Sequence, residues 1–273
     1  MLTKAGTQEP TGAVVESPLM LEDEETPPEG PVLATPGPGS PRLRAASEVI
    51  LCSGFPTQLL LVAAFGLLGI GAVDASGGLS LRWVVMLSLA DAILLLGLIF
   101  YFLHRGGERP THVFLGSRPP RREFLLGLML TPVMVGLAIA SISLLHEVWP
   151  EIRNVPENPF EALLQSPADA ATFAVVAVLA GGLREELQRA FILVRFEQHL
   201  GGAWVGLLVF SIAFGLGHVV QGWDAAVVTA LLGALWGTIY LIRRSALSAV
   251  VSHAGFNMAE IILAVASIGS SAG

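Results

Sequence analysis

Four ionisable residues lie within six positions of an otherwise apolar stretch, at Arg184, Glu185, Glu186 and Arg189. Residues three or four positions apart share one face of a helix, so Arg189 can reach either glutamate. One arginine can therefore tether one carboxylate and leave the other free to take a proton. A carboxylate in apolar surroundings holds its proton more tightly than in water, which suits a general base near neutral pH. The sequence thus predicts an acid/base centre, and the alternative is a structural ion-pair cluster between helices.

Two further apolar segments carry polar side chains at helical spacing. Phe214 and His218 are four residues apart, and His253 and Asn257 have the same spacing. Each pair therefore projects along one face of a helix. An imidazole and an amide side by side can donate hydrogen bonds to a developing oxyanion. Taken singly, each of these residues has a structural alternative: His218 as a packed contact and Asn257 as a hydrogen bond between membrane helices.

The elements that must position these residues are membrane helices. The 273-residue chain is 53% hydrophobic and 14% charged, with a mean hydropathy of +0.69, whereas soluble domains average about 25% charged residues. A membrane span needs about 20 apolar residues. We therefore expect an all-α, polytopic membrane helical bundle in the cell membrane, with about seven transmembrane helices, at 55–73, 83–103, 124–145, 168–195, 202–221, 224–242 and 245–267.

The basic residues predict the orientation of this bundle. The joint 104–122 holds five arginines and one glutamate, while the joint 146–167 holds four glutamates and one arginine. Cytoplasmic loops carry the excess of Lys and Arg, so the first joint should be cytoplasmic and the second external. The N-terminus is then inside and the C-terminus outside.

The depth of the polar residues decides whether they can meet. At a rise of about 1.5 Å per residue, Glu186, His218 and His253 all fall within the hydrocarbon region. Gly181 and Gly182 lie in the middle of the long fourth span and permit a kink or a break through which water reaches the charges.

The chain divides into three expected regions. Residues 1–45 hold eight of the 17 prolines, with seven acidic against three basic residues, and we expect a disordered, solvated tail, a regulatory tail being the alternative. Residues 46–119 should form two N-terminal transmembrane helices and a basic loop, and residues 120–267 the catalytic membrane core. Asp91, alone in the second span, either pairs with an arginine of the fourth or is incidental. The single cysteine, Cys52, excludes an internal disulfide and should pack against apolar neighbours.

Taken together, the three motifs resemble the CPBP family, the CAAX prenyl endopeptidases and their Abi-like bacterial relatives. The resemblance covers about residues 120–262 and rests on the glutamate pair with its arginine and on the two four-residue pairs described above. The family pattern places three residues between the second glutamate and the arginine. Here there are two, and Ala190 stands where arginine is expected. This shift moves the four-residue pairing of Arg189 from Glu186 to Glu185.

The resemblance implies an intramembrane endopeptidase that hydrolyses a peptide bond of a membrane-associated or lipidated protein. A glutamate, Glu186 first and Glu185 next, would act with His218 to activate water. The oxyanion would be stabilised by His253 and Asn257, and the supporting residues would be Arg189 and Phe214.

No cofactor is expected, because no His-Glu-x-x-His helix is present. In the alternative, zinc would be held by Glu186, His218 and His253. The expected partners are the substrate protein and the lipid bilayer, with no nucleic acid, because the chain has no basic surface pattern. The alternative functions are a catalytically inactive family member and a membrane transporter or partner-binding protein. The absence of an internal repeat argues against a transporter.

Overall fold

The computed structural model describes residues 40–75, 77–156 and 158–271, which belong to one unit, Pro38–Gly273. These residues form helices and loops, with one isolated bridge between Val73 and Leu79. The all-α prediction is therefore confirmed for the described chain. Most of the predicted tail lies outside the described residues, and the first helix begins inside the predicted tail, at Pro41.

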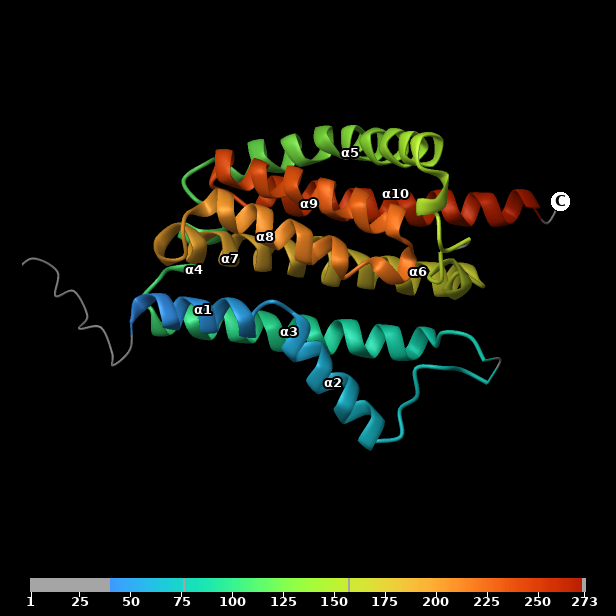
Figure 1. Ribbon diagram of the computed structural model, residues 1–273, viewed down its shortest axis with the longest axis horizontal. Coiled ribbons are helices and arrows are strands. Elements are labelled where there is room, and N and C mark those ends of the chain that lie inside the picture. The colour runs from blue at the N-terminus through green and yellow to red at the C-terminus, as the bar shows by residue number, and fades with distance from the viewer. Residues whose placement is uncertain (1–39, 76, 157, 272–273) are drawn as a thin grey trace, which may run out of the picture. The chain divides into compact units, whose positions relative to one another are not determined.

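The helices follow the chain in the order shown in Figure 1. The α-helices are α1 (Pro41–Leu51), α2 (Phe55–Leu67), α3 (Leu81–Arg105), α4 (Pro110–Phe114), α5 (Pro120–Val148), α6 (Pro167–Val176), α7 (Glu185–His199), α8 (Ala203–Leu216), α9 (Trp223–Arg243) and α10 (Leu247–Ser271). The short 3-10 helices are η1 (Pro150–Ile152), η2 (Glu161–Leu163) and η4 (Val219–Gln221), and a π-helix, η3 (Ala177–Arg184), joins α6 to α7.

The run formed by η3 and α7 lies in the middle of this bundle. It packs against α8, α9 and α10 on one side and against α1 and α3 on the other (Figure 1). The helix α5 covers the outside of α10. The charged stretch predicted from the sequence is therefore on the most enclosed helical run and can meet partners from two sides.

Several helices are suited to crossing a membrane, which indicates a multi-pass membrane protein. By length and apolar composition, α3, α5, α9 and residues Leu247–Ile268 of α10 qualify among the described residues, and α1 with α2 forms a fifth candidate if this pair, bent by 43°, is one span. Large apolar side chains are exposed along α5, as lipid contact requires, for example Met129 at 71% and Ile139 at 56%.

Four or five candidates are fewer than the seven spans that the sequence predicts. The predicted span 168–195 contains the π-helix, and α8 ends at Leu216, within the predicted span 202–221. The predicted span 55–73 is also shortened, because α2 ends at Leu67, two residues before Gly69 takes a positive φ of 72°. The seven-span topology and its orientation stay predictions.

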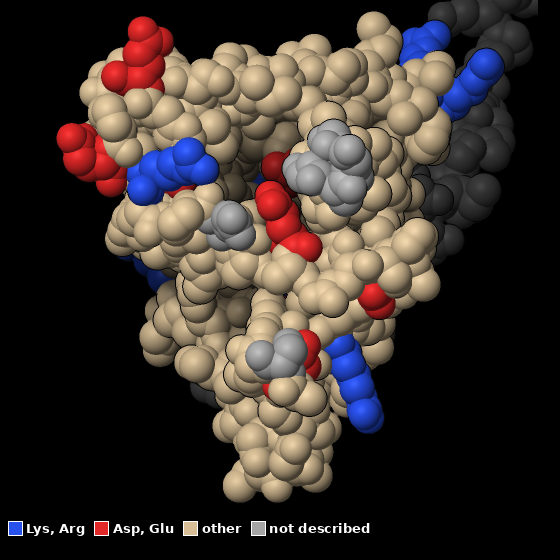
Figure 2. Space-filling view, turned by 90° about the vertical axis from the view of Figure 1, so that its right-hand side faces the viewer, with Lys and Arg blue, Asp and Glu red and all other residues tan. Residues whose placement is uncertain are grey.

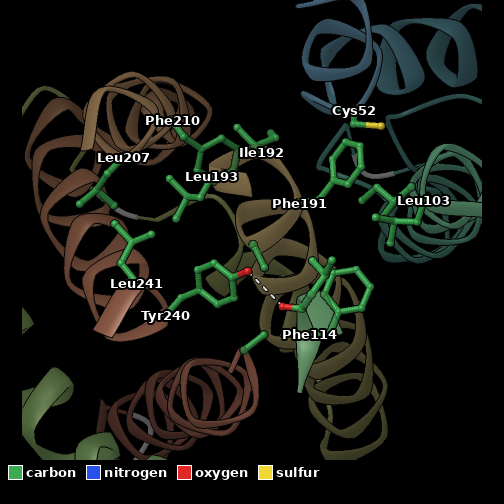
Figure 3. Close-up of a cluster of buried hydrophobic side chains, with 14 of the residues drawn as sticks. Cys52, Leu103, Phe114, Phe191, Ile192, Leu193, Leu207, Phe210, Tyr240 and Leu241 are labelled. Atoms are coloured by element: carbon green, nitrogen blue, oxygen red, sulfur yellow. Dashed lines mark hydrogen bonds between the residues drawn. The ribbon is translucent and has the colours of Figure 1, made fainter. Parts of the chain in front are cut away.

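A buried apolar cluster fixes α7 against the rest of the bundle (Figure 3). Phe191 of α7 is fully buried, and the cluster around it includes Leu103 of α3, Phe114 of α4 and Cys52, which directly follows α1. On the α9 side, the Tyr240 hydroxyl donates a hydrogen bond to the Val113 carbonyl at 3.0 Å. The prediction that Cys52 packs against apolar neighbours is confirmed.

Candidate active site

The glutamate pair begins α7, directly after the π-helix η3. The glycine pair predicted to kink this span lies in η3, and its role is close approach to α10. A Cβ atom on Gly182 would lie 2.7 Å from the Ala254 Cα, and one on Gly181 would lie 2.4 Å from the Asn257 Nδ2. Because both positions lack a side chain, the backbone of η3 rests on α10. This contact brings the third predicted motif against the first.

Glu186 is the more constrained of the two glutamates. It is 1% exposed, and its Oε1 accepts hydrogen bonds from the Arg189 Nη1 and from the His253 Nδ1, the latter at 2.8 Å. The sequence left both glutamates within reach of Arg189. Arg189 pairs with Glu186 three positions earlier, because its guanidinium turns toward the aromatic rings of α8 and α9. Its Cζ lies 4.7 Å from the Phe214 ring centroid and 5.9 Å from that of Trp236.

Glu185 is the less constrained carboxylate. Its side chain is 18% exposed, and its Oε2 lies 3.8 Å from the His253 Nε2. Its Oε1 lies 3.9 Å from the Arg184 Nη1. Both separations exceed hydrogen-bond length, so this carboxylate is near two cationic or polar groups without being fixed by either. The imidazole of His253 therefore stands between the two glutamates, with one nitrogen toward each.

Trp236 is a site residue that the sequence did not predict. Its ring stacks on His253, with centroids 3.9 Å apart and an interplanar angle of 14°. Its Nε1 donates to the Ser252 Oγ at 3.3 Å, and the side chain is 1% exposed. The available signal was its place near the middle of an apolar helix, since tryptophans of membrane proteins are enriched at the interfaces.

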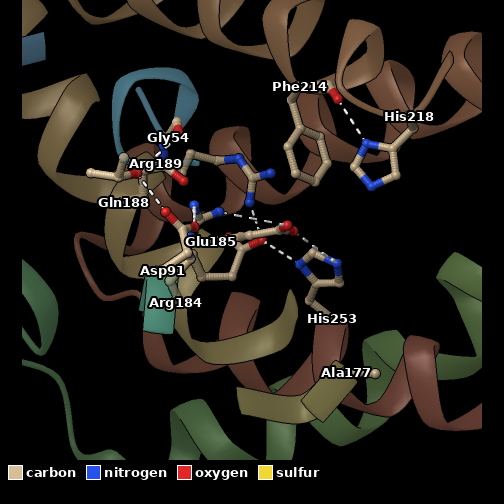
Figure 4. Close-up of polar contacts among 12 residues, drawn as sticks. Gly54, Asp91, Ala177, Arg184, Glu185, Gln188, Arg189, Phe214, His218 and His253 are labelled. Carbon is tan, nitrogen blue, oxygen red and sulfur yellow. Dashed lines mark hydrogen bonds and ion pairs between the residues drawn. The ribbon is translucent and has the colours of Figure 1, made fainter. Parts of the chain in front are cut away.

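His218 lies beyond the end of α8, and its contacts are with Phe214. Its Nδ1 lies 2.8 Å from the Phe214 carbonyl oxygen. A carbonyl only accepts, so Nδ1 carries a proton, and Nε2 is the acceptor in the neutral form of the imidazole. The Phe214 ring lies 4.9 Å from the His218 ring and 6.2 Å from the His253 ring, between centroids. Phe214 thus connects the two histidines in the arrangement that Figure 4 shows.

Asn257 lies one helical turn beyond His253 and contacts the π-helix. Its Nδ2 donates to the Ala177 carbonyl at 3.0 Å. The structure therefore brings Glu185, Glu186 and His253 together and places Asn257 at the edge of this cluster.

The face of the η3–α7 run that is turned toward α3 is held by residues from the N-terminal part of the chain. Arg184 forms an ion pair with Asp91 of α3, which is one of the two possibilities that the sequence left open. The Thr57 hydroxyl donates to the other oxygen of Asp91 at 2.5 Å. Gln188 donates to the Cys52 carbonyl at 2.7 Å. No local pattern points to Thr57 or Gln188, because single polar side chains within apolar helices are common.

The proposed zinc ligands do not fit a metal site in this arrangement. Within residues 40–75, 77–156 and 158–271, no group of three or more His, Cys, Asp and Glu side chains has a geometry that could hold a metal ion. The Glu186 Oε1 already accepts from a guanidinium and an imidazole, and a neighbouring cation disfavours a second one.

Acidic side chains also gather where the surface is hollowed. Figure 2 views the end of the bundle that carries the C-terminal part of α10 and the loop between α2 and α3, and acidic side chains lie in and beside a recess near the centre of this view.

A comparison with known protein families identifies a match for part of the chain. Residues 167–259 match the family model described as Type II CAAX prenyl endopeptidase Rce1-like. No curated protein matches the chain, and no solved structure matches it. The matched segment holds both glutamates, Arg189 and the two predicted four-residue pairs, and it leaves out α1, α3 and α5. Residues 167–259 are therefore a domain of the Rce1-like type II CAAX prenyl endopeptidase (CPBP) family, the family that the three motifs predict.

Proposed function

We propose that this chain is an intramembrane endopeptidase that hydrolyses a peptide bond of a lipidated, membrane-associated protein. The family description names CAAX prenyl endopeptidases, which favours prenylated proteins as the substrate class. The observation that carries the proposal is the accessible Glu185 carboxylate 3.8 Å from the buried His253 imidazole, within a bundle of apolar helices. An acid/base pair in such a place serves chemistry on a substrate that comes from the membrane.

In this proposal Glu185 is the general base. The sequence favoured Glu186, but that carboxylate is fully buried and already accepts from Arg189 and His253. Glu185 is partly exposed, and its contacts within the described part of the chain are the longer ones to His253 and Arg184. His218, whose Nε2 is an acceptor, would orient the same water. Glu186 and Arg189 would then hold His253 in position.

The reaction follows from these roles. Glu185 takes one proton from water while the water oxygen bonds to the carbon of the scissile carbonyl. The carbonyl π electrons move to oxygen, and the oxyanion accepts hydrogen bonds from His253 and Asn257. Glu185 then gives its proton to the leaving nitrogen as the C–N bond breaks, which yields a carboxyl and an amine.

Donation by His253 requires a proton on Nε2 as well as on Nδ1. The Nδ1 lies 2.8 Å from the Glu186 Oε1, and the Nε2 faces Glu185.

We further propose that the protein crosses the membrane seven times, with its N-terminus in the cytoplasm. Support comes from the unbroken helical run Pro167–His199, which is long enough to span, and from η4, which extends α8 toward Gln221. The arginine-rich joint between α3 and α5 would be cytoplasmic. Cysteines placed singly in each joint should react with an impermeant maleimide from alternating sides, and reaction of neighbouring joints from the same side would contradict this topology.

The protease is tested with purified protein in proteoliposomes and a prenylated peptide. We expect Glu185→Gln to abolish cleavage and His218→Ala to reduce it strongly. Glu197→Gln is the matched control, because Glu197 lies on the same helix but pairs with Arg244 near the surface. Cleavage by Glu185→Gln at the wild-type rate would contradict the assignment of the base.

A further inference from the structure

The run η3–α7 presents two opposite faces to the bundle. Positions 184 and 186 differ by about 200° around a helix, since each residue turns about 100°. Glu186 faces α10, where His253 lies, and Arg184 faces α3, where Asp91 lies. Glu185 stands between these faces. Groups on the α3 side can therefore act on the proposed base without touching substrate.

Arg184 has two carboxylates within reach. Its guanidinium is paired with Asp91, and its Nη1 is 3.9 Å from Glu185. The arginine side chain is 7% exposed, so it cannot turn into solvent. A buried arginine without a partner is costly, and loss of one carboxylate would drive it onto the other.

Asp91 is itself held in place from α2. It is 3% exposed and accepts from the Thr57 hydroxyl at 2.5 Å. Gly54, at the break between α1 and α2, has a φ of 90°, and a Cβ there would lie 3.0 Å from the Arg184 Nη2. The absence of a side chain at Gly54 leaves the room that the guanidinium needs beside Asp91.

We propose that Asp91 is a positioning residue that holds the Arg184 guanidinium off Glu185 and so keeps Glu185 free to accept a proton. This inference rests on the proposed function, in which Glu185 is the base. A carboxylate in direct contact with a guanidinium is a weaker base, because the ion pair favours its charged form. Asp91 and Thr57 lie outside the family match, so this device belongs to the N-terminal helices of this chain.

The position of Arg184 can be measured without any substrate. A double-mutant cycle between Arg184→Gln and Glu185→Gln, read from the free energy of unfolding in detergent, gives their coupling. The cycle is run in the parent protein and in Asp91→Asn. We expect the coupling to rise at least about twofold in Asp91→Asn, because the arginine then moves onto Glu185. Glu123→Gln, which breaks the buried pair of Glu123 with Arg243 between α5 and α9, should leave the coupling unchanged.

The consequence for catalysis is measured per folded molecule in proteoliposomes. We expect Asp91→Asn to lower kcat about tenfold or more with KM unchanged, as loss of a general base does. Adding Arg184→Gln to Asp91→Asn should restore kcat to within about threefold of the parent, since the competing cation is removed. Thr57→Val should give a smaller loss of the same kind. The Glu123→Gln control should keep the parent kcat.

The outcomes separate this inference from the protease proposal. Unchanged coupling in Asp91→Asn overturns the inference, whatever the cleavage. Increased coupling with an unchanged kcat in an active protein also overturns it. Increased coupling in a protein whose parent form cleaves no substrate overturns the protease and supports Asp91 as the residue that holds Arg184 off Glu185.

Discussion

Two buried arginines on α7, Arg189 and Arg195, are paired in different ways. Arg195 is 3% exposed and donates to Glu48 at 2.5 Å, to Glu108 at 3.0 Å and to Gln198 at 3.2 Å. Arg189 is fully buried and donates only to Glu186. Its Nε and Nη2 have no hydrogen-bond partner among the residues that the structure describes, and rings surround its guanidinium.

The difference separates a fully paired ion cluster, at Arg195, from an incompletely paired one beside the candidate active site, at Arg189. Buried donors are nearly always satisfied, and an unsatisfied one costs about 1–3 kcal/mol. Arg195 follows this rule. Its ion pairs join α7 to α1 and to the loop that follows α3. Arg189 departs from it beside the residues proposed to do chemistry. The aromatic rings offset part of that cost, because a desolvated guanidinium over a ring gains about 2 kcal/mol. Arg195 therefore has the pairing of a stabilising residue, and Arg189 is the residue that we propose holds His253 in position through Glu186.

The largest expected effect on stability is at Arg195. Arg195→Met leaves Glu108 without its cation and Glu48 with Arg44 as its remaining one, and breaking a buried pair in this way costs about 3–5 kcal/mol. We expect that loss in chemical unfolding in detergent, while cleavage per folded molecule stays at the wild-type level. A fall in cleavage by the folded fraction would show that the comparison between the two arginines is wrong.

Substitution of Arg189 should lower both the free energy of unfolding and the rate of cleavage. Arg189→Met leaves Glu186 with its hydrogen bond to His253 and fills the space among the rings, so we expect a smaller loss of about 2–3 kcal/mol in the unfolding free energy. Cleavage should fall about 100-fold or more, because His253 loses a fixed partner. The measurement is kcat for protein shown to be folded. A variant that is less stable yet cleaves normally would make Arg189 a structural residue like Arg195.

A substitution at the contact between η3 and α10 should have a third, smaller effect on stability and cleavage. Gly182→Ala places a methyl group 2.7 Å from the Ala254 Cα, and overpacking of this kind costs about 1–3 kcal/mol. Because α10 must move away, His253 should separate from Glu186 and cleavage should decrease. Gly136→Ala on α5, where no atom lies within 4 Å of the added Cβ, is the matched control and should leave both measurements unchanged.

The smallest effect is expected at the exposed end of α7. Glu197 pairs with Arg244 at 2.5 Å, and this hydrogen bond lowers the pKa of the Glu197 carboxyl. A lowered folded-state pKa contributes stability above the unfolded pKa, and that contribution is lost as the pH falls through the folded pKa. Both side chains are partly exposed, so Glu197→Gln should cost about 0.2–1 kcal/mol at pH 7 and nothing in strong acid. A larger cost, or one independent of pH, would contradict this reading.

The sequence could predict the composition of the site but only part of its geometry. The spacing and order of the motifs led to Glu185, Glu186 and His253, which the structure brings together. Helical spacing could not decide which glutamate Arg189 binds, because positions three and four apart are both within reach. The aromatic rings of α8 and α9 decide it, and they come from other parts of the chain.

Other features depend on contacts that no local pattern encodes. Apolar sequence gives the same signal for an α-helix and for the π-helix η3. The glycines at 181 and 182 signalled a kink, whereas the structure uses them for contact with α10. The stacking of Trp236 on His253 joins two helices and therefore has no signal in the spacing of either. The number of spans was uncertain for a similar reason, because apolar length does not show where a helix ends.

The buried cluster around Phe191 has a consequence for how this protein can be divided. Its members come from both sides of the family boundary, with Cys52, Leu103 and Phe114 outside residues 167–259. A fragment limited to the family domain would expose the surface that these side chains cover, and the carboxylate that pairs with Arg184 would be missing. The segment that matches the family model is therefore shorter than the segment that must fold as one unit. Transplanting this chemistry into another protein would require carrying the N-terminal helices along with it.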